Sequence, residues 1–219
     1  MARAKNGFTG PLSGKVGNLV ACTWKGIPYV RSRPAIVNPP NSPSQMAQQM
    51  RMKKTMEFLH PLKEFIRLGF GAYTENKSAF NVALSYNMKN ALTGEYPDIK
   101  IDNSKALVSM GTLPGASQTT VSTDEPGKIK IEWNPQSDEP NAHSYDQGII
   151  VIYNTSIPEV YYTIEATKRD TGIAIINLPD KYQSHELQCY LIFARKELLL
   201  GSLSEKNISN SCYCGKISF

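Results

Sequence analysis

The sequence predicts an α+β protein in which an N-terminal β-hairpin arm and helices precede a C-terminal antiparallel, immunoglobulin-like β-sandwich. Between residues 42 and 92, apolar residues recur at intervals of three and four, as on one side of a helix. From about residue 128, short β-prone segments alternate with turn residues and no helical pattern separates them. We expect a basic hairpin and helical region over 1–111, a linker rich in Gly, Ser, Thr and Pro over 112–127, and the sandwich over 128–219.

The hairpin is predicted from two β-prone runs, 19–24 and 27–33, around a two-residue turn that ends in glycine. Residues 7–18 hold four glycines and a proline, which indicates a turning backbone before the hairpin. Pro28 cannot donate a hydrogen bond to a ladder, so its strand should lie at an edge or be interrupted. Alternating residues of this strand should share a face: Tyr29, Arg31 and Arg33.

Three helical segments are expected after the hairpin. The proline-rich stretch 38–43 is typical of a stiff linker, and Ser42 and Pro43 suit the start of a helix. Pro61 should interrupt this helix, and two more helical segments should follow, the last one ending before Gly94. Arg51 and Lys54 are expected away from the apolar side of the first helix, which is predicted to consist of Met46, Ala47, Met50, Met56 and Leu59.

Short strands are expected through most of the remaining chain. Two are predicted at 99–101 and 106–110. Seven more are predicted for the sandwich, at 128–133, 148–153, 160–164, 172–178, 187–193, 198–202 and 211–219. Such a series is best satisfied by two antiparallel sheets packed face to face. Trp133 should anchor the core between them, on the same face as Ile129 and Ile131.

Charge is distributed unevenly along the 219 residues, which carry a formal net charge of +5. Residues 1–100 hold 14 Lys/Arg and 5 Asp/Glu, whereas residues 101–219 hold 10 and 14, and no acidic residue precedes Glu57. A basic front can attract the acidic back of another copy or a polyanion. No apolar run follows residues 1–7 and none is long enough to span a membrane, so we expect no secretory signal and, by default, a cytoplasmic location.

Several blocks of this sequence resemble a family of proteins of unknown function and similar length from Bacteroidota. The blocks are Ser13-Gly14-Lys15-Val16-Gly17-Asn18, Trp24-Lys25-Gly26-Ile27, Arg31-Ser32-Arg33-Pro34, Ala79-Phe80-Asn81 and Asn90 to Asp98. The resemblance runs along the whole chain and is most specific over residues 10–34. It implies a bacterial or phage-borne source, and it implies no activity, because the family has none assigned.

The search for catalytic motifs predicts that the chain is not an enzyme. It contains no phosphate-binding loop, dinucleotide fingerprint, zinc-protease helix or nucleophile elbow. His60, His143 and His185 have no nucleophile beside them in the sequence. Cys212 and Cys214 would lie on one face of a strand, which suits either two buried thiols or half of a metal site, and we favour the thiols. No cofactor and no metal are expected.

The remaining features predict a non-enzymatic structural or interaction protein that self-assembles through its basic N-terminal arm. A phage virion component or a bacterial filament would be concrete forms, and a homo-oligomer is expected because a lone hairpin is barely stable by itself. The alternative is a nucleic-acid-binding accessory protein that uses the basic half. Both interpretations rest on the same residues, Lys15, Trp24, Lys25, Tyr29, Arg31, Arg33, Arg51, Lys53 and Lys54.

Overall fold

The computed structural model describes residues 3–8, 12–24, 26–33, 42–75, 77–123, 125, 127–136, 139–182 and 185–218. It divides into two compact units, Met1–Ser42 and Pro43–Phe219, which we call the N-terminal and the C-terminal unit. The boundaries expected at 111/112 and 127/128 do not coincide with this division. They fall inside the C-terminal unit because its helices and strands share a hydrophobic core.

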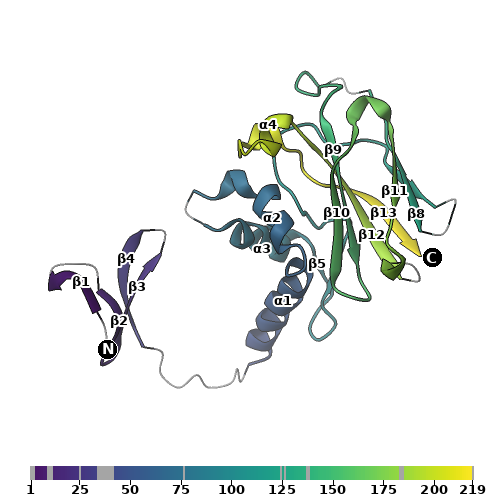
Figure 1. The fold of residues 1–219 in the computed structure, drawn as a ribbon. Helices are drawn as coiled ribbons and strands as arrows, with labels where there is room; N and C mark the ends of the chain where they lie inside the picture. Colours follow the sequence, from purple (N-terminus) through teal and green to yellow (C-terminus); the bar gives the residue numbers. More distant parts are fainter. Residues whose placement is uncertain are drawn as a thin grey trace. The chain divides into compact units, whose positions relative to one another are not determined.

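The N-terminal unit is a four-stranded antiparallel sheet in the order β1-β2-β3-β4, and the strands are labelled in Figure 1. The strands are β1 (Arg3–Phe8), β2 (Leu12–Val16), β3 (Leu19–Trp24) and β4 (Ile27–Ser32). The predicted hairpin is confirmed as β3 and β4, with Pro28 in an edge strand. The segment 7–18, expected to be a turning backbone, instead contains the end of β1 and all of β2. Gly17, at φ 55°, opens the two-residue turn between β2 and β3. Residues 38–41 of the expected linker lie outside the described residues.

Three helices open the C-terminal unit, and the break at Pro61 is confirmed. They are α1 (Pro43–Leu59), α2 (Lys63–Gly69) and α3 (Ala79–Asn90), with a 3₁₀ turn η1 (Gly71–Tyr73) between the last two. Ser78 caps α3 by accepting a hydrogen bond from the Asn81 backbone N–H at 3.2 Å.

The predicted apolar side of α1 is confirmed at Leu59 and wrong at Met46 and Met56. Met46 and Met56 are exposed, whereas Thr55, Phe58 and Leu59 are buried and Arg51 is half-buried. The half-buried Arg51 guanidinium donates to the Met88 carbonyl at 3.2 Å. Methionine, glutamine and lysine alternate around the first three turns, so the sequence gives these turns no dominant apolar side, and packing against α3 decides which side is covered.

The C-terminal unit also contains two antiparallel sheets in the orders β10-β9-β12-β13 and β11-β8-β7. The strands are β7 (Thr120–Ser122), β8 (Lys128–Glu132), β9 (Gln147–Asn154), β10 (Glu159–Lys168), β11 (Ile173–Asn177), β12 (Glu186–Ala194) and β13 (Cys212–Ser218). Six of the seven strands predicted for the sandwich are therefore confirmed. Strand β7 lies within the segment that was expected to be a linker.

The four-stranded sheet of this unit is the middle of three layers, with α1–α3 on one side and the three-stranded sheet on the other (Figure 1). One face carries Ile150, Leu191 and Phe193 into a core with residues of β8 and with the predicted anchor Trp133, which directly follows β8. The opposite face carries Ile149, Val151, Tyr190 and Ile192 into a second core with the helices. Strands β9 and β12 are therefore buried on both faces, which explains their almost continuous apolar sequences.

Two predicted strands are wrong, for different reasons. Residues 106–110 form no strand because other groups satisfy their backbone: Leu107 N–H donates to Asn87 Oδ1 at 3.0 Å and Val108 N–H to Ser211 Oγ at 3.0 Å. The segment 198–202 overlaps a short helix, α4 (Lys196–Leu199), which ends just before Gly201 at φ 98°. The remaining elements are β5 (Leu92–Thr93), β6 (Lys100–Ile101), η2 (Arg169–Thr171), η3 (Asp180–Tyr182) and η4 (Glu205–Asn207).

Candidate functional site

The register of the N-terminal sheet sorts its side chains onto two different faces. Paired residues in antiparallel strands project to the same side, and Lys15 pairs with Val20, which pairs with Arg31. Cys22 pairs with Tyr29 and Trp24 with Ile27 on this same side. We define the cationic–aromatic face by Lys15, Val20, Cys22, Trp24, Ile27, Tyr29 and Arg31. The apolar face consists of Leu12, Val16, Leu19, Ala21, Pro28 and Val30, with Gly14, Thr23 and Ser32.

The apolar face is exposed and carries no charged residue among the described positions of β2, β3 and β4. Leu19 and Val30 are 50% and 55% exposed, and Leu12 and Val16 are exposed as well. Ala21 is the one buried apolar residue described in this unit. No second layer of the N-terminal unit covers the face, because the unit's described residues form this single sheet. A sheet of this kind needs another surface to bury its apolar side chains.

The cationic–aromatic face combines unpaired cations with exposed rings. Among the described residues, Lys15, Arg31 and Arg33 form no ion pair, and no acidic residue occurs before Glu57. Arg33 lies one residue past β4, where its backbone N–H donates to the Asn18 carbonyl at 2.6 Å. Trp24 is 49% exposed and Tyr29 is exposed beside it on the next strand. Lys25, which was also expected here, lies outside the described residues.

The other three predicted cations belong to the C-terminal unit and already have partners there. Arg51 donates to the Met88 carbonyl, as described above. Lys53 and Lys54 both lie near the Glu57 carboxylate, with N–O distances of 3.9 and 3.3 Å. The two exposed ion pairs with Glu57 are weak. Together with the hydrogen bond of Arg51, they leave these three cations less available to a polyanion than the cations of the N-terminal sheet. The structure therefore divides the predicted set between two units.

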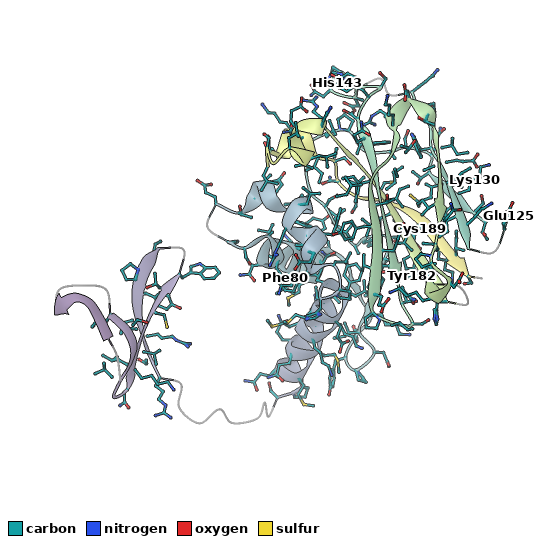
Figure 2. The ribbon with its side chains drawn as sticks, viewed as in Figure 1. Phe80, Glu125, Lys130, His143, Tyr182 and Cys189 are labelled. Carbon is teal, nitrogen blue, oxygen red and sulfur yellow. The ribbon has the colours of Figure 1, made fainter. Side chains whose placement is uncertain are left out.

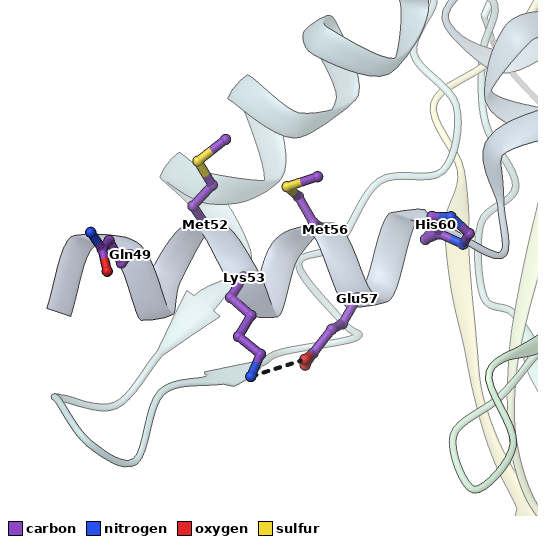
Figure 3. A pocket seen from close by; sticks show the side chains of 6 residues that line it. All are labelled: Gln49, Met52, Lys53, Met56, Glu57 and His60. Carbon is purple, nitrogen blue, oxygen red and sulfur yellow. Dashed lines mark ion pairs between the residues drawn. The ribbon is translucent and has the colours of Figure 1, made fainter. Parts of the chain in front are cut away.

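Helix α1 carries a methionine-lined groove that sequence reasoning missed, and Figure 3 shows its side chains. The groove has a volume of about 480 Å³ and is lined by Gln49, Met52, Lys53, Met56, Glu57 and His60. Met52 and Met56 are exposed one turn apart. The helical pattern put Met56 on the apolar side of its helix, so nothing in the sequence indicated an exposed groove. Flexible methionine side chains adapt to apolar partners of different shape.

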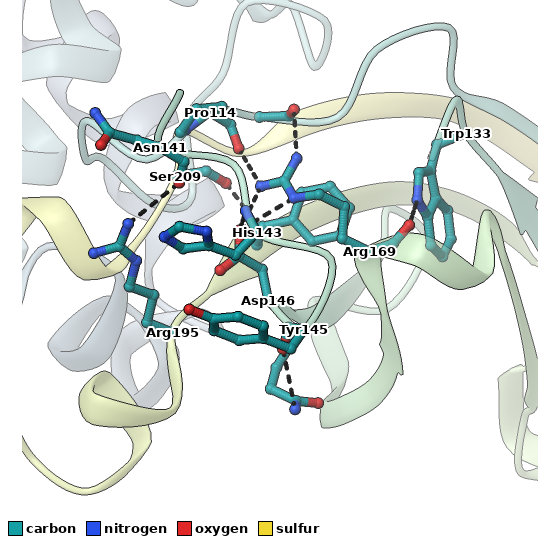
Figure 4. A network of polar contacts seen from close by, with 12 residues as sticks. Pro114, Trp133, Asn141, His143, Tyr145, Asp146, Arg169, Arg195 and Ser209 are labelled. Atoms are coloured by element: carbon teal, nitrogen blue, oxygen red, sulfur yellow. Dashed lines mark hydrogen bonds and ion pairs between the residues drawn. The ribbon is translucent and has the colours of Figure 1, made fainter. Parts of the chain in front are cut away.

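A buried ion pair between Arg169 and Asp146 lies at one end of the sandwich, at the centre of a polar network shown in Figure 4. The Arg169 guanidinium contacts Asp146 Oδ2 through Nε and Nη2, both at 3.1 Å. It also donates to the carbonyls of Pro114 at 2.7 Å and Gly115 at 3.3 Å, and it lies 3.9 Å above the Phe193 ring. Burial lowers the pKa of Arg169, and the Asp146 carboxylate opposes this shift.

This network ties segments of the sandwich together and presents no reactive group. Trp133 Nε1 donates to the Arg169 carbonyl at 2.9 Å, and the His143 backbone N–H donates to Asp146 Oδ2 at 3.0 Å. The His143 ring stacks on Tyr145 with a centroid distance of 5.0 Å, outside the ion pair. Because Arg169 is buried and its donors point to protein acceptors, we interpret it as a structural clamp.

The cysteines of the C-terminal unit are poorly suited to reaction or metal binding. Cys189 and Cys214 lie in the core between the two sheets, and Figure 2 labels Cys189. Burial raises the pKa of the Cys214 thiol to about 12 and shifts the pKa of Cys189 further in the same direction. Cys212 is half-buried, with its sulfur 3.6 Å from Thr119 Oγ1. In the described residues, no group of three or more His, Cys, Asp or Glu side chains is placed to hold a metal ion.

No helix in the described ranges is both long and apolar enough to cross a membrane.

Half of the chain is similar to fibronectin type III domains. The crystal structure of the FN3 domain of human collagen XX is 12% identical, with a TM-score of 0.36, and the match covers 50% of this chain and 95% of that one. The solution structure of the fn3 domain of the human collagen alpha-1(XX) chain is 8% identical, with a TM-score of 0.34 and coverages of 48% and 84%. A structure described as a myokine is 11% identical, with a TM-score of 0.33 and coverages of 49% and 96%.

No curated protein matches the sequence. The model of DUF6266, a family of unknown function, matches residues 10–215, which include the cationic–aromatic and apolar faces, the helices and the sandwich. This agrees with the expected resemblance to an uncharacterised family, while the source in Bacteroidota stays a prediction. Because the match spans nearly the whole sequence, the chain belongs to the family of unknown function DUF6266.

Proposed function

We propose that the chain is a non-enzymatic structural protein that self-assembles, with the apolar face of its N-terminal sheet packed against the same face of a second copy. The observation that carries this proposal is the exposed, uncharged face formed by Leu12, Val16, Leu19 and Val30. The C-terminal unit would be displayed by the assembly. Its two sheets of three and four antiparallel strands support an immunoglobulin-like sandwich.

Charge restricts the orientation in which two copies can pack against each other. Residues 1–42 carry six Lys/Arg and no Asp/Glu, so two N-terminal units repel each other in most orientations. The register places Lys15 and Arg31 on the opposite face, so apolar packing at the usual spacing of about 10 Å between sheets keeps these cations on the outside. An isologous contact of this type forms a closed two-fold dimer.

The salt dependence of assembly follows from this arrangement. Added salt screens the repulsion between the two basic units and does not weaken apolar contacts. Self-association should therefore strengthen as salt rises from low to physiological concentration. An assembly that depended on attraction between the basic front of one copy and the acidic back of another would show the opposite trend.

Light scattering of the full chain tests the proposal. We expect a dimer for the wild-type chain and a monomer for Leu19→Lys and Val30→Lys, because each substitution places a charge within the apolar contact. Ile175→Lys is the matched control: this residue is also exposed and β-branched, but it lies on β11 in the C-terminal unit, so the dimer should persist.

Removing residues 1–42 separates the two units and should give a monomer whose buried Trp133 keeps its native fluorescence. A monomeric wild-type chain, or a dimer that survives both Leu19→Lys and this deletion, would overturn the proposal. Negative-stain images then distinguish a closed dimer from the ring or filament of a virion or filament component, which would need a second interface on each copy.

A further inference from the structure

The two types of side chain on the cationic–aromatic face are separated along the strands. Lys15, Val20 and Arg31 form one row across β2, β3 and β4. Successive rows on one face are about 7 Å apart, because each residue advances the strand by about 3.3 Å. Cys22 and Tyr29 form the next row, and Trp24 and Ile27 form the row after that. Cations therefore occupy one end of the face, and exposed rings occupy the middle and the other end.

The charge of this face is uncompensated. Lys15 and Arg31 have no acidic partner among the described residues, and Arg33 adds a third cation just beyond β4. No acidic residue occurs anywhere in residues 1–56. A polyanion is the partner that such a surface attracts, and the attraction acts before contact.

The exposed rings narrow the class of polyanion. Trp24 and Tyr29 present flat apolar surfaces beside the cations, on which unpaired bases can stack. A duplex hides the flat surfaces of its bases, and a lipid headgroup has none. We infer that the cationic–aromatic face binds single-stranded nucleic acid, with phosphates on Lys15, Arg31 and Arg33 and bases stacked on Trp24 and Tyr29. This site is separate from the proposed dimer contact, which uses the opposite face of the sheet.

Fluorescence titration of the full chain with oligothymidylate measures this binding directly. Trp24 is 49% exposed and Trp133 is 4% exposed, so stacking should quench the emission of Trp24 selectively. If three cations each contact one phosphate, the logarithmic salt slope is about −2, and affinity falls about 20-fold between 50 and 200 mM salt. Nucleic-acid binding should weaken with salt, whereas dimer formation should strengthen with salt. The two proposals can therefore be tested separately, and either one can be wrong without the other.

Substitutions assign the roles of the residues. Trp24→Ala should weaken binding roughly 5- to 150-fold, the range typical for losing one stacked base, and Trp24→Phe should retain most of the affinity. Arg31→Gln combined with Arg33→Gln should reduce the salt slope to about one third, because one phosphate contact remains. Both variants should keep the wild-type mass in light scattering, which shows that the sheet is intact.

A charge-matched control excludes a general effect of net charge. Lys63→Gln combined with Lys89→Gln also removes two exposed cations, but from α2 and α3 in the C-terminal unit, and it should leave the salt slope unchanged. Bound oligonucleotide should also slow thiol labelling of Cys22, which lies beside Tyr29 on the same face, and should leave Cys212 unaffected.

Four results would overturn the inference. They are the absence of binding at 50 mM salt, equal losses in the Arg31/Arg33 variant and the Lys63/Lys89 control, unchanged labelling of Cys22 in the complex, and binding of duplex DNA or phosphatidylserine vesicles as tight as that of oligothymidylate. The last result would show that the face recognises negative charge alone.

Discussion

The protein contains two four-stranded antiparallel sheets that differ mainly in what covers them. The sheet β10-β9-β12-β13 lies between helices and a second sheet, so its central strands are buried on both faces. The described residues of the N-terminal unit form no layer that covers the sheet β1-β2-β3-β4, and β4 is exposed along its whole length. The same backbone arrangement therefore serves as a core in one unit and as a pair of surfaces in the other.

The amino-acid sequences of the strands account for this difference in burial. Strand β12 (Glu186–Ala194) is apolar or aromatic after Glu186 and Gln188 near its start, as a strand buried on both faces requires. Strand β4 instead mixes three apolar or aromatic residues with proline, arginine and serine. Proline and arginine at an edge discourage further strand pairing. The N-terminal sheet is thus protected along the edge formed by β4, and its faces are the surfaces left for partners.

The largest effect is expected where the same residue type is buried in one unit and exposed in the other. Arg169→Gln leaves the buried Asp146 carboxylate without its ion pair and should lower the free energy of unfolding by about 3–5 kcal/mol. Arg31→Gln on the exposed face should change it by less than about 0.5 kcal/mol. Urea denaturation followed by tryptophan fluorescence measures both, because Trp133 reports on the C-terminal unit and Trp24 on the N-terminal unit. Equal effects would mean that the clamp contributes no more than a surface arginine.

The next largest difference in unfolding free energy between the two sheets is expected when apolar side chains are truncated to alanine. Leu191 and Ile192 are fully buried neighbours on opposite faces of β12, so each change to alanine should cost about 2–5 kcal/mol. Val30, on the apolar face of the N-terminal sheet, is 55% exposed, and its change to alanine should cost less than about 0.5 kcal/mol in the isolated monomer. A small effect at Ile192 would show that the helices do not stabilise the face they cover.

The sequence predicted individual elements well where one physical signal dominated. The hairpin turn ending in Gly26, the helix start at Pro43 and the break at Pro61 all follow from local backbone chemistry. The burial of Trp133 follows from its alternation with Ile129 and Ile131. The layering could not be predicted in this way, since it depends on which distant elements share a core. Residues 106–110 illustrate this, because Asn87 and Ser211 replace the strand partners that the apolar pattern suggested.

The candidate site was predicted in part for the same reason. Alternation along one strand correctly put Tyr29 and Arg31 on one face. Lys15 and Trp24 joined that face only through the pairing of β2, β3 and β4, and β2 was not expected within the glycine-rich segment 7–18. The charge count grouped Arg51, Lys53 and Lys54 with the arm, although contacts with Met88 and Glu57 hold them in the C-terminal unit. Counting charge along a sequence cannot distinguish unpaired cations from paired ones.

A moderate effect of alkali should be confined to the C-terminal unit. Burial raises the pKa of Cys214 to about 12 and that of Cys189 further, whereas an unfolded thiol has a pKa of about 8.5. The unfolded state therefore releases these protons first, so the contribution of the two thiols to stability is constant below about pH 8.5 and falls as the pH rises towards 12. Each thiol contributes a slope of up to about 1.4 kcal/mol per pH unit.

Urea denaturation between pH 8 and 10.5 measures this slope. Burial also raises the pKa of Tyr190, so some slope should persist above pH 10 in a chain that carries Cys189→Ala and Cys214→Ala. This double variant should nevertheless be clearly less sensitive to pH than the wild-type chain between pH 8.5 and 10. A wild-type stability that does not change over that interval would show that the two thiols are not buried as the fold requires.

The smallest expected difference between the two sheets concerns the rate at which their cysteines react with a thiol reagent, and it does not involve stability. Cys22 is half-buried on the cationic–aromatic face, whereas Cys189 and Cys214 are buried in the core of the C-terminal unit. A thiol reagent should label Cys22 in the native chain and should reach Cys189 and Cys214 only after unfolding, because both access and thiolate formation are suppressed in the core. The Cys22→Ala variant should lose one rapidly labelled equivalent with no change in Trp133 emission. Slow labelling of Cys22 in the chain without nucleic acid would mean that a second layer covers the cationic–aromatic face. That face would then be enclosed like the sheet β10-β9-β12-β13, and the surface on which the nucleic-acid inference rests would not exist.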